Sequence, residues 1–146
     1  MASLLDLANR MDKLAKNVDK AASESAVKVA LTIVGELAFK TPVDTSKALS
    51  SWFVTLDVPS STVGVPHVYG EQGSSRNASA AQTLADAKRA LANKKAGQII
   101  YIVNNQPYIK RLNAGWSKQQ AAGFVERAVM VGQLQIKSIK LKIEGV

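Results

Sequence analysis

The sequence predicts one α+β domain: a long N-terminal helix, a small antiparallel sheet of about three to four strands, and two further helices packed on that sheet. Three observations lead to this prediction. Apolar residues recur at helical spacing over the first 40 residues, alternate at strand spacing after residue 52, and return to helical spacing after residues 79 and 118. The 146 residues suit one domain with one core, and no repeat or linker divides them.

Residues 1–40 form the longest predicted element. Apolar residues from Leu4 to Leu37 recur at i, i+3, i+4 and i+7, and Pro42 ends the pattern because the residue before a proline is driven out of helical geometry. Unbroken, this helix would be about 50 Å long at 1.5 Å per residue. So small a domain cannot cover that length with its own core. We therefore expect either a break near Ala21–Ser25 or packing against a neighbouring subunit.

A short helix, a strand and the partner of that strand are expected next. Asp44 suits the N-cap of a short helix from Thr45 to about Ser50. From Trp52 to Val58 apolar and polar side chains alternate, as in a strand. Thr62 to Tyr69 is expected to be the partner strand, and Pro66 places it at the sheet edge because proline has no N–H to donate.

The rest of the chain is expected to form an exposed loop, a helix, a strand buried on both sides, a short helical piece and a last helix: residues 69–80, 79–93, 99–103, 107–115 and 118–137. Residues 138–143 alternate in hydropathy, but the pattern does not decide their structure.

Composition removes several classes of site. The chain has no cysteine, which excludes disulfides, thiolate metal ligands and a cysteine nucleophile. His67 is the single histidine, and neither a phosphate-binding glycine loop nor a metalloprotease motif occurs. No apolar run approaches the roughly 20 residues that cross a bilayer, and the N-terminus lacks the pattern of a signal peptide. We expect a protein that is not an enzyme, with no cofactor, metal, membrane or small-molecule substrate.

Positive charge is concentrated in the middle of the chain. The net charge is +8, and residues 71–120 hold eight basic and two acidic side chains, which gives +6 of that total. Such a surface either meets DNA or an acidic partner, or is a solvated face that keeps the protein dissolved. Tyr101, Tyr108 and Trp116 lie among these charges, although Tyr101 falls in an apolar strand. The candidate contact residues are Lys88, Arg89, Lys94, Lys95, Lys110 and Arg111.

Two stretches, Lys40–Trp52 and Asn105–Val125, together carry a resemblance to a known family. The first reads KTPVDTSKALSSW and the second reads NQPYIKRLNAGWSKQQAAGFV. In order and separation they resemble conserved segments of the minor tail or neck proteins of tailed bacteriophages, the tail-completion and head–tail joining proteins. The matching positions are Pro42, Asp44, Thr45, Leu49, Trp52, Pro107, Tyr108, Leu112, Gly115, Ser117, Gln119 and Gly123.

The sequence departs from that family's pattern at four positions. Ser46 stands where glycine is usual, Asn113 where glutamate is usual, and Ala122 and Phe124 near the usual proline and methionine. Each replacement keeps side-chain size or turn compatibility. We therefore expect the fold to be retained, with Asn113 as the position at which a subunit contact would change.

The resemblance implies a structural virion protein without catalysis. Such a protein would reside in the host cytoplasm during assembly and then at the head–tail interface. It would form a ring of its own copies, commonly sixfold in tails, around the channel through which DNA passes, and would contact the neighbouring neck and tail proteins. Two alternatives remain: a tail terminator, and a basic DNA-binding accessory protein.

Overall fold

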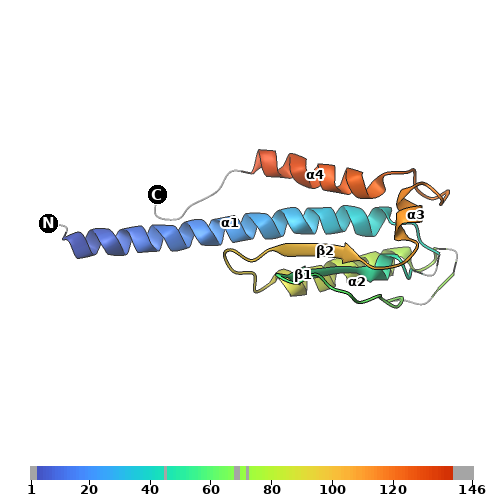
Figure 1. Ribbon diagram of the computed structural model, residues 1–146, viewed down its shortest axis with the longest axis horizontal. Helices are drawn as coiled ribbons and strands as arrows, with labels where there is room; N and C mark the ends of the chain where they lie inside the picture. Colours follow the sequence, from blue (N-terminus) through green and yellow to red (C-terminus); the bar gives the residue numbers. More distant parts are fainter. Residues whose placement is uncertain (1–2, 45, 68–69, 72, 140–146) are drawn as a thin grey trace.

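The structure, a computed structural model, describes residues 3–44, 46–67, 70–71 and 73–139. Its elements are, in order, α1 (Leu4–Lys40), the short 3-10 helix η1 (Leu49–Ser51), β1 (Trp52–Leu56), α2 (Arg76–Leu91), β2 (Ile100–Asn104), α3 (Ile109–Asn113) and α4 (Phe124–Ser138). α4 lies along one side of the C-terminal half of α1, and the sheet and α2 lie along the other side (Figure 1).

Helix α1 runs without a break, so the expected interruption near residues 21–25 is wrong. Ser3 begins it with a capping box: its hydroxyl accepts from the Asp6 N–H and the Asp6 carboxylate accepts from the Ser3 N–H, each at 3.1 Å. The packed body covers only the second half of the helix, and the first half projects beyond it (Figure 1). The other expectation, contact with a neighbouring subunit, stays a prediction.

The sheet has two antiparallel strands in the described part of the chain, so the expected three to four are not confirmed. β1 pairs with β2, with Trp52 opposite Asn104 and Leu56 opposite Ile100. Residues 62–67 are not the partner strand. They are tied to the start of β1 by serine side chains: the Ser51 hydroxyl accepts from the Gly64 N–H at 3.0 Å, and that of Ser50 accepts from the His67 N–H at 2.8 Å.

Other segment boundaries also differ from those predicted. The short helix expected over 45–50 is reduced to η1. The expected exposed loop over 69–80 ends early because α2 begins at Arg76, and Ser79 and Ala80 are buried. β2 is half-buried at every residue, since a two-stranded sheet leaves part of its surface open. The last helix starts at Phe124 and not at Lys118. Residues 140–143 lie outside the described residues.

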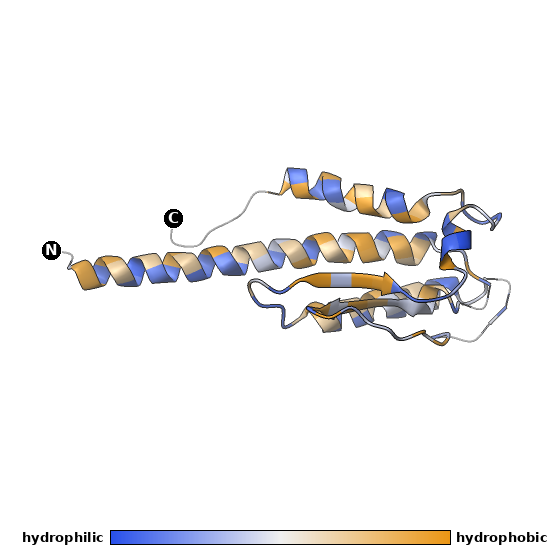
Figure 2. Cartoon of the chain, viewed as in Figure 1, coloured by the Kyte–Doolittle hydropathy of each residue, from blue (hydrophilic) through white to orange (hydrophobic). Residues whose placement is uncertain are grey.

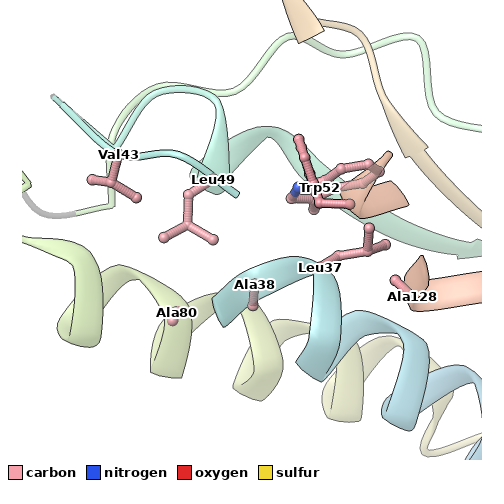
Figure 3. Packing of buried hydrophobic residues seen from close by; sticks show 8 residues of the cluster. Leu37, Ala38, Val43, Leu49, Trp52, Ala80 and Ala128 are labelled. Carbon is pink, nitrogen blue, oxygen red and sulfur yellow. The ribbon is translucent and has the colours of Figure 1, made fainter. Parts of the chain in front are cut away.

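The core lies where the C-terminal end of α1 meets η1, β1, α2 and α4 (Figure 3). Small residues from three helices meet there: Ala38, Ala80 and Ala128 are almost fully buried. Close approach of α1 and α4 also depends on Gly132, because a Cβ at that position would lie 2.5 Å from the Ile33 side chain. Alanine and glycine thus compensate for an aromatic fraction of only 5% by letting backbones approach one another.

Trp52 joins this core to the end of α1. Its indole N–H donates to the Thr41 hydroxyl at 2.8 Å, and that hydroxyl donates to the Leu37 carbonyl at 2.5 Å. Thr41 and Leu37 are both buried, so water cannot replace either bond. Pro42 ends α1, and these two hydrogen bonds hold its last turn in the core.

We expect Trp52→Phe to lower the free energy of unfolding by about 2–4 kcal/mol, because it removes a buried donor and part of a packed ring. Urea unfolding followed by circular dichroism measures this loss. Trp116→Phe is the matched control, since Trp116 is 72% exposed and its replacement should cost less than about 0.5 kcal/mol. Equal losses for the two variants would contradict the assignment of Trp52 to the core.

Candidate functional site

The two stretches that carry the resemblance, far apart in sequence, meet at the C-terminal end of α1. Their link is the side-chain amide of Gln119. Its oxygen accepts from the Val43 N–H at 2.8 Å, and its nitrogen donates to the Val43 carbonyl at 2.7 Å. The Gln119 amide therefore satisfies both the N–H and the carbonyl of Val43, which lies just after α1. A neighbouring β-strand would provide the same pair of hydrogen bonds. We call this contact and its surroundings the motif junction.

Arg76, the first residue of α2, completes the motif junction. Its guanidinium donates to the Phe39 carbonyl at 3.2 Å and also to the side-chain oxygen of Gln119. The Phe39 carbonyl belongs to the last turn of α1, where a cation is favoured by the helix dipole. One cation thus links α1, α2 and the loop before α4. Sequence reasoning missed this residue, because nothing local marks an arginine in a loop as a partner of distant carbonyls.

A shallow pocket of about 240 Å³ opens at the motif junction. Both stretches line it, with Pro42, Val43, Asp44, Ser46, Lys47 and Ala48 from the first and Tyr108, Leu112, Ser117 and Gln119 from the second. Burial raises the pKa of the Tyr108 phenol, so this group stays a neutral hydrogen-bonding group at physiological pH. The lining therefore offers both hydrogen-bonding and apolar groups.

Asn113 fastens α3 to the start of α4. Its side-chain oxygen accepts from the Val125 N–H at 2.9 Å, and its amide donates to both carboxylate oxygens of Glu126 at 2.9 Å. Its backbone carbonyl accepts from the Gly123 N–H at 2.7 Å. Gly123 has no side chain with which to cap α4, so Asn113 satisfies a free N–H of the first turn from outside. A glutamate here would instead set two carboxylates against each other.

Six of the predicted motif positions line the pocket at the motif junction: Pro42, Asp44, Tyr108, Leu112, Ser117 and Gln119. Pro42, Leu49 and Trp52 are buried, and Tyr108, Leu112, Ser117 and Gly123 are half-buried, whereas Asp44, Pro107, Gly115 and Gln119 are exposed. Gly115 and Gly123 adopt φ values of +91° and +84°, which favour glycine. Thr45 lies outside the described residues.

The candidate basic residues do not form one patch. Lys110 and Arg111 belong to α3, at the end of the body where α1 finishes, whereas Lys88 and Arg89 belong to the C-terminal part of α2 (Figure 1). The remaining two, Lys94 and Lys95, line a surface cavity together with Asp19 and Glu24 of α1.

Two of these basic residues contact an acidic or an aromatic side chain. Arg89 donates to the Asp86 carboxylate at 2.6 Å, which offsets part of its charge. Arg111 stacks over the exposed ring of Trp116, 5.1 Å from its centre. Trp116 is therefore held at the surface beside a cation, where it can meet a partner.

His67 has neighbours that the sequence did not indicate. Its Nε2 lies 3.4 Å from the Asp86 carboxylate, and its Nδ1 lies 3.5 Å from the Thr83 hydroxyl. The Thr83 hydroxyl is buried and donates to the Leu49 carbonyl, so it holds α2 against η1. Across the described residues, no group of three or more histidine, cysteine, aspartate or glutamate side chains is arranged to hold a metal ion.

Gln106 is another residue that sequence reasoning missed. It is almost fully buried, and its amide donates to the Ser51 hydroxyl at 2.9 Å and to the Gly64 carbonyl at 3.3 Å. It therefore ties the second stretch to the residues just before β1. Nothing in the local sequence around Pro107 indicates that this polar side chain is buried.

Comparisons with protein-family models, curated proteins and solved structures find no match for this chain. Within the described ranges, no helix has both the length and the apolar character that crossing a membrane requires.

We expect Gln119→Ala to lower the free energy of unfolding by about 1–3 kcal/mol, since it leaves both backbone groups of Val43 without their partner. Chemical denaturation provides the measurement. Lys118→Ala, at the exposed neighbouring position, is the control and should change stability by less than about 0.5 kcal/mol. An unchanged midpoint for Gln119→Ala would show that the motif junction does not depend on this amide.

Glu126 provides a pH-dependent prediction. The hydrogen bonds from Asn113 lower the pKa of its carboxyl, so its contribution to stability is present above the unfolded-state pKa and is lost as pH falls through the folded-state pKa. Asn113→Ala should raise the Glu126 pKa toward its ordinary value and flatten the dependence of stability on pH in that acidic range. Carbon-detected NMR titration of the Glu126 carboxyl would measure this directly. An unchanged titration would refute the coupling.

Proposed function

We propose that this chain is a non-enzymatic structural protein of a tailed-phage particle, one that completes the tail and joins it to the head as a ring of copies. The observation that carries the proposal is the motif junction. The two stretches that resemble the neck family are not scattered over the fold but pack on one another through Val43 and Gln119 at one end of the molecule. Segments selected for a shared structural task are expected to meet in this way.

The surface around the motif junction also suits an assembly role. It combines a shallow pocket, the exposed Trp116 stacked by Arg111, and the basic residue Lys110. Interface anchors are enriched in tryptophan, tyrosine and arginine, and they need a rigid support. The hydrogen bonds of Gln119 and Asn113 provide that support. We propose that this end of the body meets a neighbouring neck or tail protein.

A DNA-binding accessory role is the competing proposal from another class. It is favoured by the net charge of +8. Against it, the basic residues lie in separate groups, and Asp19, Glu24 and Asp86 lie near three of them. A protein that neutralises several phosphates loses affinity steeply with salt. In the ring, these cations would face an acidic neighbour or the DNA in the channel.

Electron microscopy of particles made without this gene tests the proposal. Full heads beside separate tails of normal length are the expected result. Overlong tails would assign the protein as the terminator that stops tube growth. Normal infectious particles would refute both virion roles and favour the DNA-binding role, which salt-dependent binding of the purified protein to duplex DNA would then test.

Complementation with single variants locates the contact. Trp116→Ala should reduce the yield of joined particles by at least about tenfold, since interface anchors dominate binding energy. Val58→Ala is the matched control, because Val58 is also exposed but lies after β1, away from the motif junction. Equal yields from both variants would count against a partner at the motif junction.

A further inference from the structure

An exposed apolar stripe runs along the half of α1 that projects from the body. It consists of the exposed residues Leu4, Leu7, Met11 and Leu14 and the half-buried Val18, whose spacing alternates three and four residues. Leu4 is 86% exposed, Met11 63% and Leu7 51%. This heptad spacing is the one by which helices pack along one another. In Figure 2 apolar residues recur along the projecting half of α1 as they do along the packed half.

An apolar groove of about 430 Å³ lies further along the same helix. Val29, Ala30 and Ile33 of α1 form its floor, and Ile100 and Ile102 of β2 line it with Ile136 of α4. The volume accepts several aliphatic side chains. The groove and the stripe lie on the same face of α1, because Leu4, Met11 and Val18 recur every seven residues and Ser25, the next in that series, also lines the groove.

We propose that two copies of this chain pair through antiparallel α1 helices, so that the stripe of each copy fills the groove of the other. The stripe cannot fill the groove of its own copy, since both belong to one continuous helix. A parallel pairing that seats the stripe of one copy in the groove of the other shifts the second copy along the helix axis, so that the groove of the second copy stays empty. Antiparallel helices place the two bodies at opposite ends of the pair, where the projecting halves leave room (Figure 1).

The contact area favours this pairing over a simple contact between two stripes. A helix face of about 10 Å width from Leu4 to Ile33 covers about 440 Å², whereas the stripe alone covers about 210 Å². Stable interfaces bury about 800 Å² per partner. The antiparallel contact is about twice that of two stripes, and the side chains of β2 and α4 that line the groove add to it. The contact between two stripes remains far below the area of a stable interface.

Charge agrees with the same arrangement. Residues 4–18 hold three basic and two acidic side chains, and residues 18–32, which they face in the other copy, hold two of each, so the two segments do not repel each other strongly. Arg10 and Glu24 are two heptads apart and share one flank of α1. With Leu7 of one copy opposite Val29 of the other, Arg10 of each copy comes within about 3 Å, measured along the axis, of Glu24 of the other.

The two-fold axis of this register passes at Val18. A two-fold contact closes on itself and cannot build a ring, so the proposed neck ring would use other surfaces, such as the motif junction. The pairing does not rest on the virion role. It is tested on the purified chain, so its failure is distinguishable from that of the particle experiment.

Sedimentation of the full chain is the first test. We expect a species of twice the 15.6 kDa monomer mass. Met11→Lys and Ile136→Lys should each raise the dissociation constant at least tenfold, one by changing the stripe and the other by changing the groove. Val65→Lys is the control, since Val65 is similarly exposed but belongs to neither surface, and it should leave the mass unchanged. Circular dichroism checks that each variant is folded.

Cysteine cross-linking tests the direction of the helices. The chain has no cysteine, so every introduced thiol is unique. Val18→Cys should form a disulfide with its own copy on oxidation. Met11→Cys should not, but should cross-link when mixed with Ala26→Cys. Efficient self-linking of Met11→Cys would overturn the antiparallel arrangement.

Other occupants of the groove would give different results. A wild-type monomer at 100 µM would overturn the proposal. If that monomer then paired on removal of residues 140–146, the chain's own C-terminal segment would be identified as the occupant. A closed assembly of more than two copies that Ile136→Lys disrupts would overturn the two-fold contact and favour a head-to-tail ring.

Discussion

The fold depends on how α1 ends. A 37-residue helix must stop at one residue for the following stretch to reach its place. Pro42 ends it there, and the buried hydrogen bonds from Trp52 to Thr41 and from Thr41 to Leu37 hold its last turn in the core. Val43 can then pair with the Gln119 amide. Two distant parts of the chain are aligned by the end of one helix, and the pocket, α3 and the start of α4 take their positions from it.

Elements with a strong local signal were predictable from the sequence. The apolar stripe and Pro42 predicted α1, and helical spacing predicted α2 and α4. Boundaries were less predictable, because distant contacts set them. Residues 62–67 carry β-branched side chains, but Ser50 and Ser51 bind their backbone through hydroxyls, and β2 takes the place beside β1. Pairing of β1 with β2 is decided by packing between segments far apart in sequence, which no local pattern encodes.

The sequence predicted several residues of the candidate site, but it did not predict the contacts between them. The resemblance selected Pro42, Leu112 and Gln119, which do line one pocket. Nothing in the sequence selected Arg76 or Gln106, because their hydrogen-bond partners lie far from them along the chain and come close only in the folded protein. Basic residues that lie close in the sequence are also separated in the fold, since α2 and α3 carry them to different ends of the body.

The break expected in α1 shows how a failed prediction can be informative. A domain of this size cannot cover a helix of about 50 Å with its own core. The structure keeps the helix whole and leaves Leu4, Leu7 and Met11 exposed at its projecting end. A polar sequence would suffice for a helix that stays in water, yet this one retains a heptad stripe. These apolar residues therefore indicate contact with another apolar surface. The groove lined by Val29, Ile33 and Ile136 is apolar and also borders α1.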